Sequence, residues 1–260
     1  MLLNRIYFMK TIKPIFSLIL FYFLTITNAQ VYQLDYQFNN YIAVFGETNS
    51  FKTTLEYDVE NNKSLYTVHL KDITPKNELK NDNVIVIASD EIDNVLVYSD
   101  FNTSEMVIQE QIDIEMMNFV EKIPTIKWNL INETKTENNL KLSKATASFR
   151  GRNYTVWYTL DIPVNVGPWK LHDLPGAIVT AEEDKGKYSW KLTGIKKLDN
   201  STIKNPLQNK SYAVKDIKDY PRLKFELSDR MIAKIRQIGV NATIPKRERN
   251  DLELKFEWEK

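Results

Sequence analysis

The sequence predicts a mainly β protein: a single domain built on a curved, half-barrel-like antiparallel β-sheet, with one amphipathic C-terminal helix packed on it. Two observations predict this class. Apolar residues recur at every second position in short runs, and polar or Asn-rich turns separate these runs. Helical periodicity is confined to one segment near the C-terminus. The chain shows neither an internal repeat nor a linker, so residues 30–260 are expected to form one domain.

The N-terminus predicts an exported protein. Arg5, Lys10 and Lys13 precede an apolar run over residues 15–26, and small residues follow it up to Ala29. This is the pattern of a cleavable signal peptide over residues 1–29, and the run is shorter than the roughly 20 residues that span a bilayer. The chain has no cysteine, so it offers no acceptor for a lipid anchor and no disulfide. The mature chain is expected in the periplasm or secreted, not as a lipoprotein and without a transmembrane span.

Charge gives no indication of a nucleic-acid partner. Removal of the signal peptide leaves 32 lysines and arginines against 34 acidic residues, because the first 29 residues carry three positive charges and no negative one. With 43% hydrophobic residues and 12% aromatic residues, the rest of the chain can support a substantial core.

The first half of the mature chain is predicted to form successive strands. Alternation predicts a strand over residues 32–38 and a hairpin of residues 50–57 with residues 65–70 around an Asn-rich turn. Residues 75–83 are polar and predict a surface loop or a short helix. Further strands are predicted over the runs 84–88, 95–98, 106–114 and 126–130.

Two hairpins are predicted in the second half, followed by the helix. The clearest pairs residues 140–149 with residues 154–162 through a turn that contains Gly151, and the next pairs residues 178–181 with residues 188–192. An amphipathic helix is predicted over residues 229–238, with Ser228 as its N-cap and Gly239 after its end. A last strand is predicted over residues 252–258.

The segment that joins these hairpins is rich in prolines and glycines. Pro163, Gly167, Pro168, Pro175 and Gly176 lie within the fifteen residues 162–176, although the whole chain has only seven glycines. Such residues fix an irregular path, which is expected to leave the sheet at Pro163 and to re-enter it at Ala177. Leu174, Pro175 and Gly176 predict a type II turn, in which glycine takes the positive φ of the third position.

These motifs resemble the signature of the GLPGLI family, secreted proteins of Bacteroidota without an assigned biochemical role. The resemblance is carried by residues 126–195, including the turn 149–152 and the Ile162-Pro163 step. Where family members read Gly-Leu-Pro-Gly-Leu-Ile, this chain keeps the central Leu174-Pro175-Gly176 and the final Ile178. The resemblance implies no catalytic residues, but it does imply a partner among outer-membrane transport components.

Five residues of the signature are candidates for binding a ligand or partner. Arg150 and Arg152 flank a glycine, and paired guanidinium groups can capture a carboxylate or phosphate; alternatively they pair with neighbouring acidic residues. Trp157, Trp169 and His172 form an aromatic group beside a rigid loop, which can contact a ligand or protein. Alternatively, the loop folds back so that Trp169 covers Trp157.

Residue spacing predicts no metal site and no cofactor. His69 and His172 have no Cys or His companion at metal-ligand spacing. A weak cation site of His172 and Asp173 with residues 182–184 is outweighed by a solvated acidic turn. The Gly-X-Ser-X-Gly elbow of a serine hydrolase is missing from the sequence.

The sequence therefore favours a non-enzymatic exported protein that binds an apolar or extended ligand on a concave sheet, or an envelope partner. The alternative is a periplasmic hydrolase that uses carboxylate and histidine chemistry, in which Asp161, His172 and an acidic residue meet in a cleft. A third possibility is a structural protein that pairs through an exposed edge strand at residues 252–258.

Overall fold

One large antiparallel β-sheet dominates the computed structural model, which describes residues 30–42, 46–70, 94–112, 115–199, 201–208, 212–226, 232–233, 237 and 249–259. Its strands are β1 (Gln30–Ile42), β2 (Glu47–Asp58), β3 (Lys63–Val68), β4 (Val95–Asp100), β5 (Glu105–Ile112), β6 (Glu115–Lys122), β7 (Asn129–Glu137), β8 (Leu140–Phe149), β9 (Arg152–Thr159), β10 (Ala177–Glu183), β11 (Tyr188–Asp199) and β12 (Ala213–Asp216). The predicted fold class is thereby confirmed.

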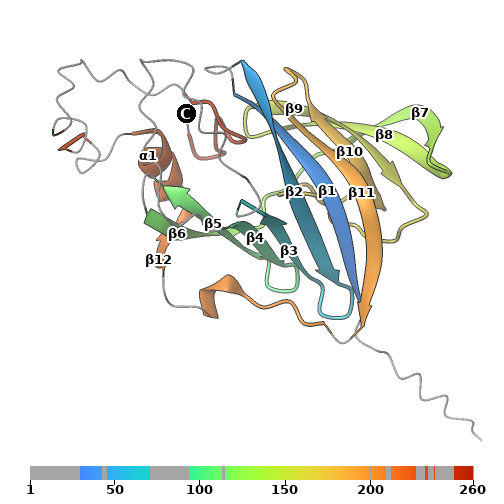
Figure 1. The fold of residues 1–260 in the computed structure, drawn as a ribbon, viewed down its shortest axis with the longest axis horizontal. Helices are drawn as coiled ribbons and strands as arrows, with labels where there is room; N and C mark the ends of the chain where they lie inside the picture. The colour runs from blue at the N-terminus through green and yellow to red at the C-terminus, as the bar shows by residue number, and fades with distance from the viewer. Residues whose placement is uncertain are drawn as a thin grey trace, which may run out of the picture.

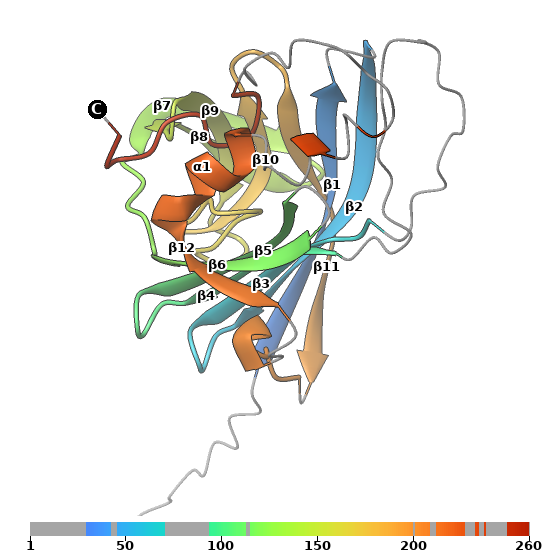
Figure 2. The same ribbon diagram turned by 90° about the vertical axis from the view of Figure 1, so that its left-hand side faces the viewer.

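The sheet is open, and its twelve strands follow the order β12-β6-β5-β4-β3-β2-β1-β11-β10-β9-β8-β7. The short strand β12 runs parallel to β6, and the other neighbours are antiparallel. β1 lies at the centre between β2 and β11, so the N-terminal strand joins the two halves of the sheet. Figure 1 shows the sheet twisting and curving around one side, and Figure 2 shows β4, β5 and β6 at one flank and β7, β8 and β9 at the other.

The hairpins predicted from alternation are confirmed. β2 pairs with β3 across a turn in which Asn62 has a φ of 49°. β8 pairs with β9, and β10 pairs with β11. The run 106–114 corresponds to β5, but β6 was not predicted, and β7 extends from Asn129 to Glu137 instead of covering residues 126–130. The predicted segments 75–83 and 84–88 lie outside the described residues.

The concave face of the sheet is covered by packed side chains. Alternate residues of β1 point into it, and Leu34 and Tyr36 are fully buried there. Three other segments cover the same face, namely the loop 160–176, the helix α1 (Tyr220–Phe225) and the C-terminal segment 249–259. The large apolar face expected for an apolar or extended ligand is thus occupied by the chain itself.

The C-terminal segment corrects one prediction. Residues 252–258 alternate perfectly in sequence but do not form a strand, and they run as turns across the concave face. The amide groups of Leu254 and Lys255 both donate to the carbonyl of Arg150, at 2.8 and 3.2 Å, and Phe256 is buried. Burial does not follow the alternation of this segment, because the polar Glu253 is buried whereas the apolar Trp258 is 36% exposed. The exposed edge strand of the third possibility is therefore absent at these residues.

The described α-helix is short and lies before the predicted one. α1 begins after the 3₁₀ turn η2 (Ile217–Asp219) and carries Pro221 in its first turn, a position that proline favours because no amide donor is needed there. Tyr220 and Phe225 pack into the core. Seven of the ten residues of the predicted range 229–238 lie outside the described residues, and the three that are described, Ile232, Ala233 and Gln237, are helical. In the described part of the chain no helix is long and apolar enough to cross a membrane.

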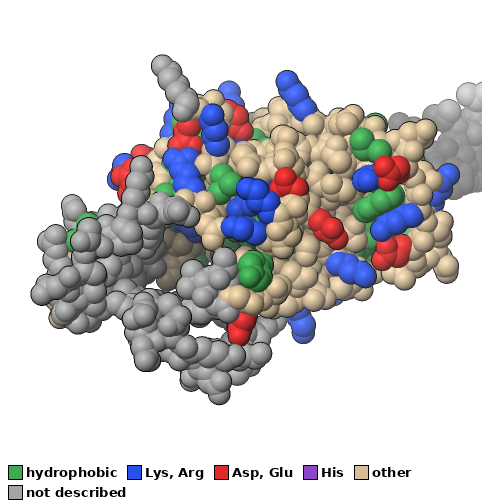
Figure 3. All heavy atoms as spheres, turned by 90° about the horizontal axis from the view of Figure 1, so that it is seen from above, with side chains coloured by type: hydrophobic (Ala, Val, Ile, Leu, Met, Phe, Trp, Pro, Cys, Tyr) green, Lys and Arg blue, Asp and Glu red, His purple; other side chains and the backbone are tan. Residues whose placement is uncertain are grey.

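The convex face is polar at the centre of the sheet and covered at one flank. Over β3 to β6, a second cluster buries Tyr98, Val107 and Ile203, with Leu207 of the 3₁₀ turn η1 (Pro206–Gln208) packed against it. Over β1 and β2 the outward side chains are polar. Seen from above, Lys, Arg, Asp and Glu side chains are interspersed over the described surface (Figure 3).

Candidate functional site

The signature loop 160–176 crosses the concave face and is held by its own backbone. Gly167 donates its amide to the carbonyl of Leu171 at 2.6 Å, and Asp173 donates to Asn165 at 3.0 Å. Chain re-entry occurs at Ala177, as predicted, and its amide donates to the carbonyl of Ile162. β9 ends at Thr159, four residues before Pro163, so Leu160 is exposed instead of facing the core.

Gly176 is required for space instead of for a positive φ. The residues with positive φ in this loop are Trp169, at 56°, and Asp173, at 69°, and Gly176 is not among them. The predicted type II turn is therefore wrong. A Cβ atom at Gly176 would lie 1.9 Å from the carbonyl oxygen of Thr159, which is backbone and cannot swing aside. The glycine allows the loop to pass directly over the end of β9.

Arg150 lies at the tip of the β8–β9 hairpin and points inward. Arg150 and Gly151 have φ values of 45° and 83°, as the two central residues of a type I′ turn require. Both ends of the guanidinium group are engaged by Glu121, with Nη2 2.5 Å from Oε2 and Nη1 3.3 Å from Oε1. The Nη1 atom also pairs with Glu253, and Nε donates to Glu257 at 3.1 Å. The sequence left two roles open for Arg150, capture of a ligand or pairing with acidic residues of the chain, and the structure shows the pairing.

A second buried cation completes an ionic cluster, which we define as Glu121, Arg150, Lys170 and Glu253. Lys170 is fully buried, and its Nζ lies 2.7 Å from both Glu121 Oε1 and Glu253 Oε1. The cluster joins β6, the β8–β9 turn, the signature loop and the C-terminal segment. Its two cations balance its two anions, as burial of charge demands.

Burial and charge act in opposite directions on the titration of this cluster. Burial alone would raise the pKa of Glu121, but Lys170 and Arg150 outweigh it and lower that pKa below its ordinary value. Burial likewise disfavours the charge of Arg150, yet Glu253 and Glu121 raise its pKa. Glu121 and Arg150 therefore stay ionised near neutral pH.

Arg152 is also buried and paired. It lies in β9, one strand position beyond the turn, and its Nη1 donates to Glu183 of β10 at 2.8 Å. Its Nε donates to the carbonyl of Asp251 at 2.6 Å, and its guanidinium lies over the ring of Tyr188. Arg152 thus fastens the C-terminal segment to the end of the sheet.

The two signature tryptophans lie on opposite faces of the sheet, so Trp169 does not cover Trp157. Trp169 is buried on the concave face, where its ring stacks on Trp190 with centroids 6.3 Å apart. Trp157 points to the convex face and is half-buried beneath Lys135, whose ammonium lies 4.6 Å from the ring centroid. Of the two, only Trp157 is placed to meet a partner.

His172 is a buried link between two loops. Its Nε2 lies 2.9 Å from the carbonyl oxygen of Pro124, which can only accept, so Nε2 carries the proton. Its own carbonyl accepts from Trp128 Nε1 at 2.7 Å, and the imidazole beside Asp173 lowers the pKa of that carboxyl. Asp161 instead contacts Thr159 and the amide of Lys141. The cleft of Asp161 and His172 that the hydrolase alternative required is therefore not formed.

A cavity of about 540 Å³ opens beside the ionic cluster. Arg150 and Glu121 form its floor, and the apolar walls come from Ile123, Ile217 and Trp258. We call it the Arg150 cavity. Lys122, Lys218, Asp216 and Glu257 add charges around its mouth. Four segments distant in sequence meet here, among them η2 and the C-terminal segment.

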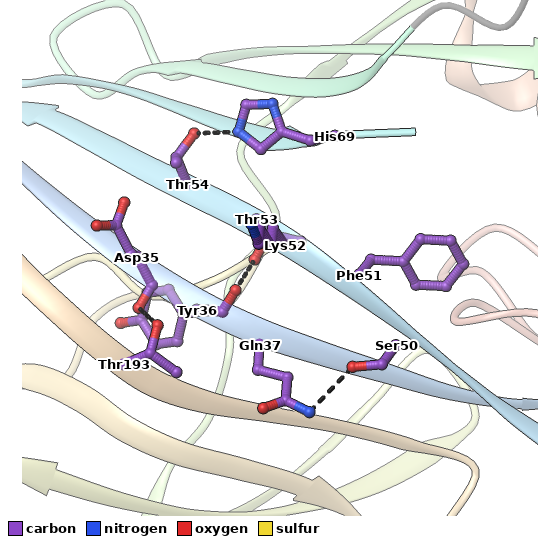
Figure 4. A pocket seen from close by; sticks show the side chains of 10 residues that line it. All are labelled: Asp35, Tyr36, Gln37, Ser50, Phe51, Lys52, Thr53, Thr54, His69 and Thr193. Atoms are coloured by element: carbon purple, nitrogen blue, oxygen red, sulfur yellow. Dashed lines mark hydrogen bonds between the residues drawn. The ribbon is translucent and has the colours of Figure 1, made fainter. Parts of the chain in front are cut away.

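A second and larger hollow lies on the convex face, over β1, β2 and β11. This convex groove has a volume of about 730 Å³. It is lined by Asp35, Tyr36, Gln37, Ser50, Phe51, Lys52, Thr53, Thr54, His69 and Thr193 (Figure 4). Figure 4 shows Asp35, Thr54 and His69 gathered on one side of β1 and β2, with the ring of Phe51 turned away from them.

A β-bulge shapes the convex groove. The register of β1 against β11 shifts between Asp35, opposite Gly194, and Tyr36, opposite Leu192, so that Thr193 is the extra residue. Its hydroxyl donates to the carbonyl of Asp35 at 3.0 Å. Bulges often occur where a strand must aim a side chain at a site.

The polar groups of the convex groove retain hydrogen-bonding capacity. Gln37 Nε2 donates to Ser50 Oγ at 2.9 Å, and Thr54 Oγ1 lies 3.0 Å from His69 Nε2, which leaves further lone pairs and donors open. Lys52 is exposed, and its ammonium makes no hydrogen bond or ion pair with any described residue. The Arg150 cavity differs, because its buried floor is already paired.

Sequence reasoning missed most of these residues. Glu121 lies in an unpredicted strand, and Lys170 follows Trp169 without any periodicity that would mark it as buried. The polar groove residues Asp35, Gln37 and Thr54 lie on the outward side of correctly predicted strands, where a site looks like any solvated face. Among the described residues, groups of three or more His, Asp or Glu side chains placed to hold a metal ion do not occur.

The fold and its cavities define a β-sheet protein with two binding-sized hollows, and comparisons place it near proteins of unknown function. A family model described as protein of unknown function (Porph_ging) matches residues 111–180, which span β6 to β10 and include the signature loop. No curated protein matches the chain.

Solved structures of PNGF-II in two crystal forms, C2 and P21, share this fold. Each superposes with a TM-score of 0.50, at 17% and 18% identity respectively, over 76% of this chain. The chain spans about a third of the length of those proteins, 33% and 34%. At this identity the likeness concerns the fold alone.

Proposed function

We propose that this protein is an exported, non-enzymatic binding protein of the GLPGLI type that holds a small polar molecule in its convex groove. The observation that carries this proposal is the groove itself. It is about 730 Å³ in volume, within the range of small-molecule sites, and four chain segments contribute hydrogen-bonding side chains to it at a β-bulge. Residues 30–260 form the binding domain, and residues 1–29 direct its export.

The lining indicates the kind of ligand. Ser50, Thr54 and Gln37 offer hydroxyl and amide groups, and Lys52 adds a cation that pairs with none of the described residues. A molecule rich in hydroxyl or carbonyl groups can satisfy these donors and acceptors, whereas an apolar molecule would leave them unpaired on losing water. The concave face argues in the same direction, because its described apolar side chains pack into the core instead of lining an open surface for an extended lipid-like ligand.

Ligand retrieval tests the proposal. Protein starting at Gln30 is purified from the envelope fraction of its host without detergent and is examined by native mass spectrometry. We expect a reproducible adduct of a polar compound on the wild type and a clear loss of that adduct in Lys52→Met and Thr54→Val. The matched control is Lys196→Met, which removes an exposed lysine of β11 outside the groove. An adduct that persists in both groove variants contradicts the proposal, and so does a clean apo mass.

An envelope protein as partner is the other form of the hypothesis. The resemblance to the GLPGLI family supports an outer-membrane transport component, and Trp157 is the signature residue placed to meet it. Pull-downs with wild type and Trp157→Ala test this form, because loss of the same captured protein in the variant would assign the partner to the face around β7 to β9.

A hydrolase is the second candidate, and one contact favours it. Thr54 Oγ1 lies 3.0 Å from His69 Nε2, a distance at which an imidazole can accept a hydroxyl proton. Hydrolysis of p-nitrophenyl acetate above the rate of free imidazole, abolished in both Thr54→Val and His69→Gln, would establish it. Equal rates in the wild type and both variants exclude this use of the pair.

A further inference from the structure

We infer that the Arg150 cavity binds an organic carboxylate that carries an apolar group, with the ligand carboxylate taking the place of Glu257 on the Nε atom of Arg150. This inference is independent of the convex groove, which lies on the other face of the sheet. It assigns a ligand-binding role to the Nε atom of Arg150. This atom contacts Glu257, which is not a member of the ionic cluster.

Arg150 is a fixed receptor for a carboxylate. Its side chain is 2% exposed, and Glu121 and Glu253 hold its two terminal nitrogens. Two aromatic rings also restrict the position of the guanidinium group, whose carbon lies 4.8 Å from the ring centroid of Phe256 and 5.7 Å from that of Trp258. A ligand that approaches Nε therefore meets a donor that is already oriented, and binding loses little side-chain entropy.

Glu257 differs from the other carboxylates on Arg150. Its side chain is 57% exposed, against 2% for Glu121 and 5% for Glu253, and it reaches Nε through a single contact of 3.1 Å. A side chain with that exposure is already largely hydrated, so its carboxylate can return to water at little cost. Glu257 therefore acts as an occupant that a second carboxylate can displace.

The charges of the cavity favour an anion in that place. The ionic cluster is neutral without Glu257, because Arg150 and Lys170 balance Glu121 and Glu253. When Glu257 swings out, the remaining charges around the mouth are Lys122, Lys218 and Asp216, an excess of one positive charge. Asp216 is itself occupied, since it accepts from the amide of Lys218 at 2.8 Å.

The walls of the cavity select what is attached to the carboxylate. Trp258 is 36% exposed and stacks on Phe256 at a centroid distance of 4.8 Å, so it presents an open face at the cavity edge. Ile123 and Ile217 line the same space. An aromatic or branched apolar group joined to the carboxylate by one or two bonds can bury against this wall while the acid meets Arg150.

The test is a titration of ¹⁵N-labelled residues 30–260 with sodium phenylacetate, followed in ¹H–¹⁵N spectra, with sodium chloride at equal ionic strength as reference. We expect saturable shifts at the amides of Glu257 and Trp258. The variant Glu257→Ala should bind about three- to tenfold more tightly, because the internal competitor is gone. Glu182→Ala, which removes an exposed carboxylate on the convex face, should leave the affinity unchanged.

Three further results decide the inference. Trp258→Ala should weaken phenylacetate binding, and Glu257→Gln should bind at least as tightly as the wild type. The ligand carboxylate can belong to a peptide C-terminus or to a small free acid, and a parallel titration with N-acetylphenylalanine distinguishes the two. Tighter binding of N-acetylphenylalanine than of phenylacetate indicates a peptide C-terminus. Equal or weaker binding indicates a small acid. Absence of saturable shifts with both acids in Glu257→Ala overturns the inference, as do equal affinities of Glu257→Ala and the wild type.

Discussion

Removing the buried ammonium of Lys170 should destabilise the whole domain. In Lys170→Met the two glutamates of the ionic cluster share Arg150 alone, so the cluster keeps one buried negative charge in excess. Glu121 and Glu253 are 2% and 5% exposed, so water cannot replace the lost contacts of 2.7 Å. Breaking a buried pair in this way costs about 3–5 kcal/mol of unfolding free energy.

Urea and thermal unfolding measure the effect. For a domain of this size each kcal/mol lowers the melting temperature by about 2–4 °C, so we expect a fall of roughly 6–20 °C. Lys196→Met is the control, because it makes the same chemical change at an exposed position, and it should change stability by less than about 0.5 kcal/mol.

A double-mutant cycle separates lost charge balance from lost packing. Glu253→Gln removes the surplus anion, so Lys170→Met combined with Glu253→Gln should be more stable than the sum of the single effects predicts, by about 1–3 kcal/mol. If Lys170→Met unfolds within about 1 kcal/mol of the wild type, the cluster is not the buried, mutually dependent unit described above. If the effects of the two substitutions on the unfolding free energy simply add, the argument from charge balance is contradicted, but the burial of the cluster is not.

Three other predictions follow from the same contacts. Gly176→Ala should prevent normal folding, because its new Cβ would lie 1.9 Å from the Thr159 carbonyl oxygen; a circular dichroism spectrum and melting curve like those of the wild type would refute this. Trp169→Ala should cost about 3–5 kcal/mol by leaving a cavity against Trp190, measured by urea unfolding. The lowered pKa of Glu121 contributes stability that is complete above its unfolded value of about 4.5 and is lost as pH falls through the folded value, so Glu121→Gln should flatten the acid limb of the stability–pH curve.

Strands such as β1 and β3 could be predicted because one face of each is buried. In β1 the alternation of Leu34 and Tyr36 with Asp35 and Gln37 reports a half-buried sheet directly. The same reasoning failed for residues 252–258, where only Glu253 and Phe256 are buried and the backbone bonds go to a turn. In this segment alternation indicates neither which side chains are buried nor whether the backbone pairs with a neighbouring strand.

The candidate sites could be predicted only in part. Arg150 was singled out from its glycine turn, but its partners come from positions 29 and 103 residues away, which no local pattern indicates. The left-handed conformations of Arg150 and Trp169 were equally hidden, because bulky side chains rarely adopt them. The convex groove depends on a bulge at Thr193, and a bulge leaves little trace in an alternating sequence.

The central claim is that a polar molecule occupies the convex groove, and chemical-shift mapping tests it most directly. ¹⁵N-labelled protein starting at Gln30 is titrated with the low-molecular-weight fraction of its host's envelope. We predict saturable shifts clustered at the amides of Gln37, Lys52, Thr54 and Thr193, which are removed by Lys52→Met. Shifts confined to other faces of the sheet, or a spectrum that the fraction leaves unchanged, would contradict the account.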